Sequence, residues 1–211
     1  MEKILLIGAG GHARACIDVV EAAGVFSIVG LVDRPEKVGG SVLGYDILGS
    51  DEDLETLTRS CKRSLVAIGQ IMSFLKREEL ARLLESYGVD FPVIKAPSAH
   101  LSRHSLIGNG TILMHRAVVN AGAAVGRHCI LNTGCIIEHD VAVGDLCHVS
   151  TGSVVNGGAR LGRGVFIGSN STINEEIRIG DGVVIGSHSL VVSDCEVPGT
   201  YVGSPARRLE R

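Results

Sequence analysis

The chain has 211 residues, of which 45% are hydrophobic and 20% charged, and its formal net charge is −3. The length allows one or two domains, and the slight acidity offers no basic surface for a nucleic acid. No apolar run approaches the ~20 residues that span a bilayer, and the run at residues 4–7 is too short for a signal peptide. We therefore expect a cytoplasmic protein with neither a nucleic-acid nor a membrane partner.

The N-terminal residues predict a strand, a helix and a second strand in succession. Ile4–Ile7 is a short apolar run typical of a buried strand, and Ala13–Ala23 has apolar residues at helical spacing. Gly24 ends this helix, and Ser27–Val32 forms the next strand, closed by Asp33. This order is that of a βαβ unit with a glycine-rich first turn.

The first turn reads Gly8-Ala9-Gly10-Gly11-His12-Ala13, which satisfies the pattern G-x-G-x-x-G/A. Its backbone N–H groups could meet a phosphate at the helix N-terminus, and Asp33 fits the acidic partner of a ribose. Binding of a dinucleotide is one interpretation. However, only about 95 residues precede the repeat region, which is enough for one mononucleotide-binding half and not for the usual pair. A tight turn without a ligand is the other alternative.

The α/β alternation continues to residue 94. We expect a helix at 51–60 capped by Ser50, a strand at 65–68 ending in Gly69, a helix at 73–87 and a last strand at 91–94. Gly69 falls at the carboxyl end of a strand, where such sheets bind ligands. The sequence thus predicts a Rossmann-like α/β domain over residues 1–96 and a second domain over residues 97–211.

The second domain carries a repeat of six residues. From Leu101 to Val197 every sixth residue is Leu, Ile or Val, 17 times in succession, and a mostly small residue stands two places before each. Such a period predicts a parallel β-helix with 18 residues in each triangular turn. Gly or Asn often follows the aliphatic residue, as in Gly108 and Asn120, and we expect left-handed backbone angles there.

Six cysteines are present, and four of them occupy the small-residue column of the repeat: Cys129, Cys135, Cys147 and Cys195. We interpret these four as small buried hydrophobic residues. No C-x-x-C pair occurs, so a zinc site has little support.

One group of polar residues in the repeats stands out as a candidate catalytic site. Glu138-His139-Asp140 is followed by His148, and neither histidine occupies an inward aliphatic position. A neutral imidazole can accept a proton near pH 7, and a neighbouring carboxylate can hold its tautomer. The alternative interpretation is a cluster of solvated surface residues without a catalytic role.

The repeats resemble the hexapeptide-repeat acyltransferases, whose β-helix is left-handed. Residues 131–140, 143–145 and 148–150, the opening Gly8-Ala9-Gly10-Gly11-His12 and the closing residues 202–208 resemble nucleotide-sugar N-acetyltransferases. That group includes enzymes for 4-amino sugars of the bacillosamine and perosamine type and shades into sialic acid O-acetyltransferases. The resemblance implies a left-handed β-helix, acetyl-CoA as co-substrate, a nucleotide-sugar substrate, no metal and a homotrimer.

The resemblance also assigns roles to single residues. It makes His139 the general base, with Asp140 as its partner at a position where the family often has Glu. It places His148, Gly157, Ser169, Ser187 and Arg207 at acetyl-CoA, with Gly157 donating its N–H to the thioester oxygen, while Arg207 and Arg208 fit either CoA phosphates or a solvated tail. It assigns the nucleotide sugar to Gly10, Gly11, His12, Asp33 and Gly69.

We therefore expect an N-acetyltransferase in which the sugar amine attacks the thioester directly. The alternatives are O-acetylation of a sialic or related sugar, a non-catalytic scaffold, and a dinucleotide oxidoreductase, which the small first domain disfavours. The sequence does not distinguish among UDP, GDP and dTDP, nor does it show the stereochemistry of the sugar.

Overall fold

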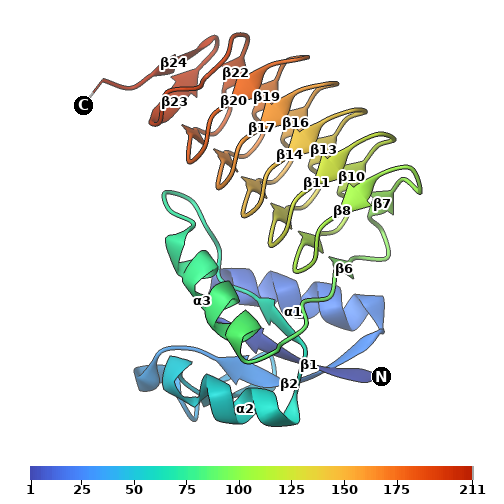
Figure 1. The fold of residues 1–211 in the computed structure, drawn as a ribbon, viewed down its shortest axis with the longest axis vertical. Helices are drawn as coiled ribbons and strands as arrows, with labels where there is room; N and C mark the ends of the chain where they lie inside the picture. The colour runs from blue at the N-terminus through green and yellow to red at the C-terminus, as the bar shows by residue number, and fades with distance from the viewer. Residues whose placement is uncertain (211) are drawn as a thin grey trace. The chain divides into compact units, whose positions relative to one another are not determined.

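The computed structural model describes residues 1–210 and divides into two compact units. The first comprises Met1–Gly69 and Leu75–Pro97, and the second comprises Gln70–Phe74 and the residues from Ser98 onward. Figure 1 shows the helices and the first sheet in one unit and the stacked short strands in the other. The assignment of residues 70–74 to the second unit was not anticipated from the sequence.

The first unit contains a mainly parallel sheet in the order β3-β4-β2-β1-β5. β1 pairs in parallel with β2 and β5, and β2 pairs in parallel with β4, whereas β3 is antiparallel to β4 at the edge. The strands β3 and β4 were not predicted. The bounds are β1 Glu2–Ile7, β2 Phe26–Val32, β3 Ser41–Val42, β4 Tyr45–Gly49 and β5 Ser64–Val66, and Ile94–Lys95 forms the short β6.

Three α-helices connect these strands: α1 (Gly11–Ala23), α2 (Leu54–Ser60) and α3 (Leu75–Ser86). Two 3-10 turns, η1 (Pro35–Lys37) and η2 (Asp51–Asp53), precede α2. All three helices were predicted, although α1 begins two residues earlier than expected. The predicted caps are present, because Gly24 adopts left-handed angles after α1 and Ser50 forms a capping box with Asp53.

Alternation along β1 divides the core of the first unit into two layers. Leu5 and Ile7 pack in one cluster with Leu54 of α2 and with Leu80 and Leu84 of α3. Ile4 and Leu6 are also buried and, because successive side chains point to opposite faces, they lie on the side covered by α1. This layering leaves the carboxyl ends of the strands open as a ligand edge.

The second unit is a left-handed parallel β-helix with one two-residue strand every six residues (Figure 1). Sheet I has the order β7-β10-β13-β16-β19-β22, sheet II the order β8-β11-β14-β17-β20, and sheet III runs from β9 through β12, β15, β18 and β21 to β23 and β24. The strands are β7 His100–Leu101, β8 Leu106–Ile107, β9 Ile112–Leu113, β10 Val118–Val119, β11 Ala124–Val125, β12 Ile130–Leu131, β13 Ile136–Ile137, β14 Ala142–Val143, β15 His148–Val149, β16 Val154–Val155, β17 Arg160–Leu161, β18 Phe166–Ile167, β19 Thr172–Ile173, β20 Arg178–Ile179, β21 Val184–Ile185, β22 Leu190–Val191, β23 Thr200–Gly203 and β24 Ala206–Arg208.

The pairing register confirms the predicted 18-residue coil. Val119 pairs with Ile137, which pairs with Val155, so the inward aliphatic side chains stack in columns along the helix. All three side chains are fully buried. Each coil therefore shields the hydrophobic layer of the next, as expected for a solenoid.

The position of the left-handed residues differs from the prediction. Positive φ angles recur three places after the inward aliphatic residue, for example at Gly110, Arg116 and Gly122, and not directly after it. The glycines directly after the aliphatic have another cause, since a Cβ added at Gly108 would lie 2.6 Å from the backbone of Gly126 in the next coil. Close stacking of the corners, and not left-handed backbone, requires glycine there.

No helix within residues 1–210 is long and apolar enough to cross a membrane.

Two neighbouring residues of β17 provide a test of the inward column. Leu161 is 4% exposed, whereas Arg160 points outward and is exposed. We expect Leu161→Ala to lower the free energy of unfolding by about 2–5 kcal/mol, because it opens a cavity between coils. Arg160→Ala, the matched control, should change it by less than ~0.5 kcal/mol. Equal effects in urea denaturation would contradict the inward assignment.

Candidate active site

A cavity of about 370 Å³ in the first unit is lined by all five residues predicted to bind the nucleotide sugar. Gly10 and Gly11 begin α1, and no side chain caps this helix N-terminus. A Cβ built on either glycine would meet nothing within 4 Å, so both face open space. The N–H groups of the first helical turn therefore face a cavity that a phosphate could enter. His12 and Gly69 lie together on this lining.

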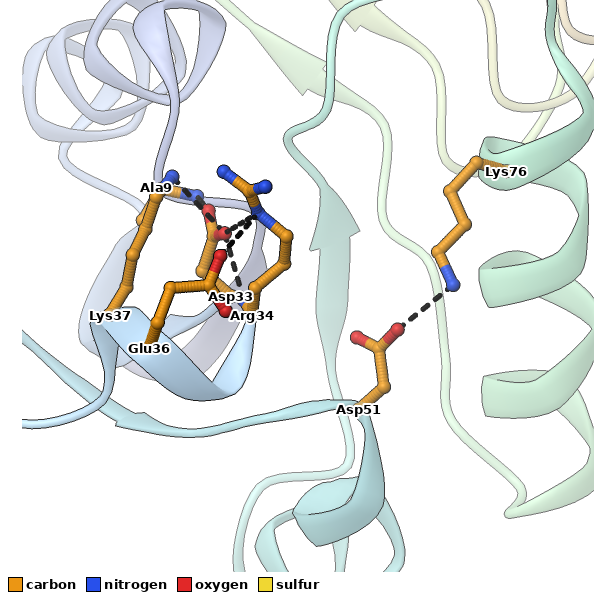
Figure 2. A network of polar contacts seen from close by, with 7 residues as sticks. All are labelled: Ala9, Asp33, Arg34, Glu36, Lys37, Asp51 and Lys76. Atoms are coloured by element: carbon orange, nitrogen blue, oxygen red, sulfur yellow. Dashed lines mark hydrogen bonds and ion pairs between the residues drawn. The ribbon is translucent and has the colours of Figure 1, made fainter.

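Asp33 lines the same cavity, but its carboxylate is already engaged (Figure 2). Its Oδ2 accepts the N–H of Ala9 at 2.5 Å and its Oδ1 accepts the N–H of Arg34 at 2.8 Å, with Lys37 Nζ 3.2 Å away. Burial acts to raise the pKa of Asp33, but these N–H groups and Lys37 together lower it. Asp33 is thus a fixed carboxylate that ties the end of β2 to the glycine-rich turn.

Asp51 and Lys76 also line the cavity, although no sequence pattern marked them as site residues. Lys76 Nζ lies 2.9 Å from Asp51 Oδ2 and 3.0 Å from Glu79 Oε1. Figure 2 shows this ion pair apart from the group around Asp33. Asp51 directly follows the capping residue Ser50 at the end of β4. Because β4 was not predicted, nothing in the sequence indicated that Asp51 lies at the edge of the sheet where ligands bind.

The second unit brings the predicted catalytic pair together at the corner between sheets I and II. His139 Nδ1 lies 2.9 Å from Asp140 Oδ2, and both side chains are well exposed. Because a carboxylate only accepts, Nδ1 carries the proton and Nε2 keeps a lone pair for a reacting group. Asp140 has a φ of 60°, and a Cβ at Gly122 in the preceding coil would collide with its carboxylate oxygen. Gly122 therefore makes room for Asp140.

The hydrogen bond that His139 donates to Asp140 is the main cause that raises the pKa of His139. Desolvation opposes it, and the charges of Asp140 and Glu138 support it. Glu138 is itself held by Asn120, whose Nδ2 donates to Glu138 Oε2 at 2.8 Å. A raised pKa makes the imidazole a stronger base.

Gly157 lies one coil beyond His139 at the same corner. A Cβ at Gly157 would fall 2.6 Å from the His139 ring, so the imidazole occupies the space that any other residue would fill. At the same position of the repeat, but at the corner between sheets II and III, the N–H groups of Arg127 and Arg163 donate to Asp145 and Asp181. The Gly157 N–H has no such partner among residues 1–210, so a donor lies beside the imidazole.

His148 has a different environment, in sheet III. It is 7% exposed, its Nδ1 donates to the backbone carbonyl of Gln70 at 2.7 Å, and its Nε2 lies 3.1 Å from Asn132 Nδ2. Phe166 packs edge-on against the ring. A carbonyl cannot donate, so Nδ1 carries the proton and Nε2 accepts from Asn132. The contact of His148 with acetyl-CoA stays a prediction.

The segment Gln70–Phe74 is held against the β-helix at both ends. Gln70 is 3% exposed, and its Nε2 donates to the carbonyl of Leu146 at 2.7 Å. At the other end the ring of Phe74 packs 4.7 Å from the guanidinium carbon of Arg163. Gln70 thus fixes the tautomer of His148, a role that a sequence without a structure does not reveal.

The remaining predicted residues are distributed over other parts of the β-helix. Ser169 and Ser187 lie at the corner between sheets III and I, where Ser169 Oγ is 3.0 Å from Ser150 Oγ. Arg207 lies in β24, paired with Val202 of β23. In a triangular coil the corner of His139 is opposite sheet III, so His139 and His148 of one chain do not meet.

All six cysteines are free and buried. Burial raises the pKa of the Cys135 thiol to about 12, and the same cause raises that of Cys16 to about 12. Thiols protonated to this degree are poor nucleophiles. No cluster of three or more His, Cys, Asp or Glu side chains suited to a metal occurs in the described part of the chain.

Two family models match the chain. Residues 3–82 match the PglD N-terminal domain, and residues 158–193 match the bacterial transferase hexapeptide repeat. These two matches agree with the α/β unit and the β-helix of short repeated strands that the structure shows. No curated protein is similar enough to count as a match.

Solved structures match over the whole length. A variant of perosamine N-acetyltransferase from Caulobacter crescentus, in complex with CoA and GDP-perosamine, is 28% identical with a TM-score of 0.94, covering 100% of this chain and 98% of that one. The acetyltransferase domain of PglB from Neisseria gonorrhoeae, in complex with acetyl coenzyme A, is 29% identical with a TM-score of 0.91, covering 99% of each chain.

The hydrogen bond between His139 and Asp140 leads to a titration prediction. Replacing Asp140 by Asn removes the charge and the anionic acceptor, so the pKa of His139 should fall and the imidazole should lose its proton at a lower pH. NMR titration of the ring protons measures this. Asp145→Asn, at another corner, should leave the His139 pKa in place, and a shift of equal size in that variant would contradict the pairing.

The anchoring of residues 70–74 leads to a second prediction. Gln70→Leu leaves the Leu146 carbonyl without its donor, which costs about 1–3 kcal/mol, so the segment should open roughly 5- to 150-fold more often. Cleavage of residues 70–74 under limited proteolysis should accelerate accordingly. The exposed neighbour Ile71, changed to Ala, is the control and should not accelerate it.

Proposed function

We propose that the protein is an acetyl-CoA-dependent N-acetyltransferase that acts on the 4-amino group of a nucleotide-linked sugar. The observation that carries the proposal is the corner where the His139–Asp140 pair lies directly against Gly157, whose N–H has no partner within residues 1–210. A base and an oxyanion donor in contact are the two groups that acyl transfer to an amine requires. The matched acetyltransferases bound to CoA and to acetyl coenzyme A support the same chemistry.

The proposed mechanism uses the geometry of this corner. The hydrogen bond to Asp140 keeps the His139 proton on Nδ1, so Nε2 takes a proton from the amine as nitrogen attacks the thioester carbon. The N–H of Gly157 donates to the oxygen of the tetrahedral intermediate. When the intermediate collapses, the C–S bond breaks and the thiolate of CoA takes up the proton held by His139. The burial of all six cysteines does not support an acyl-cysteine intermediate.

The cavity of the first unit supplies the nucleotide site in this proposal. The uncapped start of α1 would hold the diphosphate beside Gly10 and Gly11. Asp33 acts mainly by fixing the shape of the glycine-rich turn, since both of its oxygens accept backbone N–H groups. The relative bound to GDP-perosamine supports a nucleotide-linked amino sugar as the substrate.

The active unit in this proposal is a homotrimer with sites between chains. His139 and the residues predicted to contact acetyl-CoA, His148, Ser169 and Ser187, lie on different sides of one β-helix. If these residues act on one thioester, neighbouring chains must supply them. Oligomers with rotational symmetry bring such opposite faces together at each interface.

The test is an acetyl-transfer assay in which release of the CoA thiol is measured, with 4-amino sugar nucleotides and free sialic acid as acceptors. We expect release with a 4-amino sugar nucleotide, and His139→Ala should lower kcat/KM by about 10²- to 10⁴-fold. His100→Ala, an exposed histidine of β7, is the matched control and should retain activity.

Other outcomes would decide among the alternatives. Release only with free sialic acid would assign the O-acetyltransferase function instead. Nucleotide binding without any release would favour a scaffold. Full activity of His139→Ala would contradict the proposed base.

A further inference from the structure

The ion pair between Asp51 and Lys76 lies on the lining of the cavity in the first unit (Figure 2). About half of each side chain is exposed, at 44% for Asp51 and 50% for Lys76. Exposed pairs of this kind contribute little to stability. The pair therefore has no evident structural purpose, and its place on a ligand cavity points to recognition.

The order of the strands tells which part of a nucleotide this pair would face, and this step rests on the proposed function. The start of α1, which would hold the diphosphate, follows β1, while Asp33 follows β2 and Asp51 follows β4. These strands are consecutive neighbours in the sheet. Two strand spacings amount to about 9–10 Å. A nucleotide laid along this edge has its ribose near Asp33 and its base near Asp51.

Asp33 is not available to read the base. Its two oxygens accept the N–H groups of Ala9 and Arg34, and Lys37 Nζ lies beside them. Asp51 is different, because its one described partner is Lys76. A carboxylate has about four acceptor sites, so Asp51 retains capacity for further donors.

Together the pair presents a donor beside acceptors. The ammonium of Lys76 has three N–H donors, and Asp51 and Glu79 occupy two. Guanine offers the complementary edge, with the acceptor O6 beside the donors N1–H and N2–H₂. Uracil and thymine place an acceptor, O2, where guanine has N2–H₂, and that oxygen would face a carboxylate. Adenine has its donor and acceptor in the reverse order.

We propose that Asp51 and Lys76 read guanine, so that the substrate is a GDP-linked amino sugar. Asp51 accepts N1–H and N2–H₂, and Lys76 donates to O6. A bidentate contact of this kind discriminates against the wrong base by roughly 5- to 100-fold.

The test is calorimetric binding of GDP, IDP, UDP and dTDP to the full chain. The four share the diphosphate, so differences report the base. GDP should bind at least about 10-fold more tightly than UDP or dTDP. IDP lacks only the N2 amino group and should bind more weakly than GDP, which tests the Asp51 contact without any substitution.

Two substitutions complete the test. Asp51→Asn should remove most of the preference for GDP, while Glu79→Gln, which also contacts Lys76 but does not line the cavity, should keep it. Thermal unfolding midpoints confirm that both variants fold.

The outcomes separate this proposal from the one it rests on. Equal affinity for GDP and UDP, or an unchanged preference in Asp51→Asn, would overturn the guanine assignment. Acetyl transfer to a UDP- or dTDP-linked sugar in that case would leave the proposed function standing. Binding of none of the four would contradict the nucleotide site itself.

Discussion

The stacking of 18-residue coils is the constraint on which the second unit depends. Inward aliphatic residues such as Val119, Ile137 and Val155 form continuous columns, and their burial stabilises the β-helix. Every third strand must stay in register, so no residue can be inserted within a strand without displacing a column. Polar chemistry is therefore confined to corners and outward positions, and that is where Glu138, His139 and Asp140 lie.

Space at a corner is limited, because each corner stacks on the next. The exposed imidazole of His139 is accommodated because Gly157 has no side chain, and the carboxylate of Asp140 because Gly122 has none. The two glycines belong to the coils on either side of the pair. The His139–Asp140 pair thus requires the participation of three consecutive coils.

Much of the fold and part of the candidate site were predictable from the sequence, for physical reasons. A period of six is visible because each inward position independently requires an aliphatic residue, and the βαβ unit is visible because its turn needs glycine. The strand β4 was missed because its five residues mix polar with apolar side chains. The cavity-lining residues Asp51 and Lys76 were missed with it, since only the order of the sheet brings them to one edge. Glycines such as Gly108 were predicted to have left-handed backbone angles, whereas glycine is required there because the backbone of the neighbouring coil leaves no room for a side chain.

The two histidines of the predicted site show how local surroundings divide identical side chains into different roles. Both carry the proton on Nδ1, one through Asp140 and the other through the carbonyl of Gln70. The carboxylate raises the basicity of an exposed ring, whereas the carbonyl holds a buried ring whose Nε2 already accepts from Asn132. Only the first has a lone pair open to solvent. Of these two histidines, His139 therefore fits the proposed base better, whereas His148 is a fixed hydrogen-bonding group.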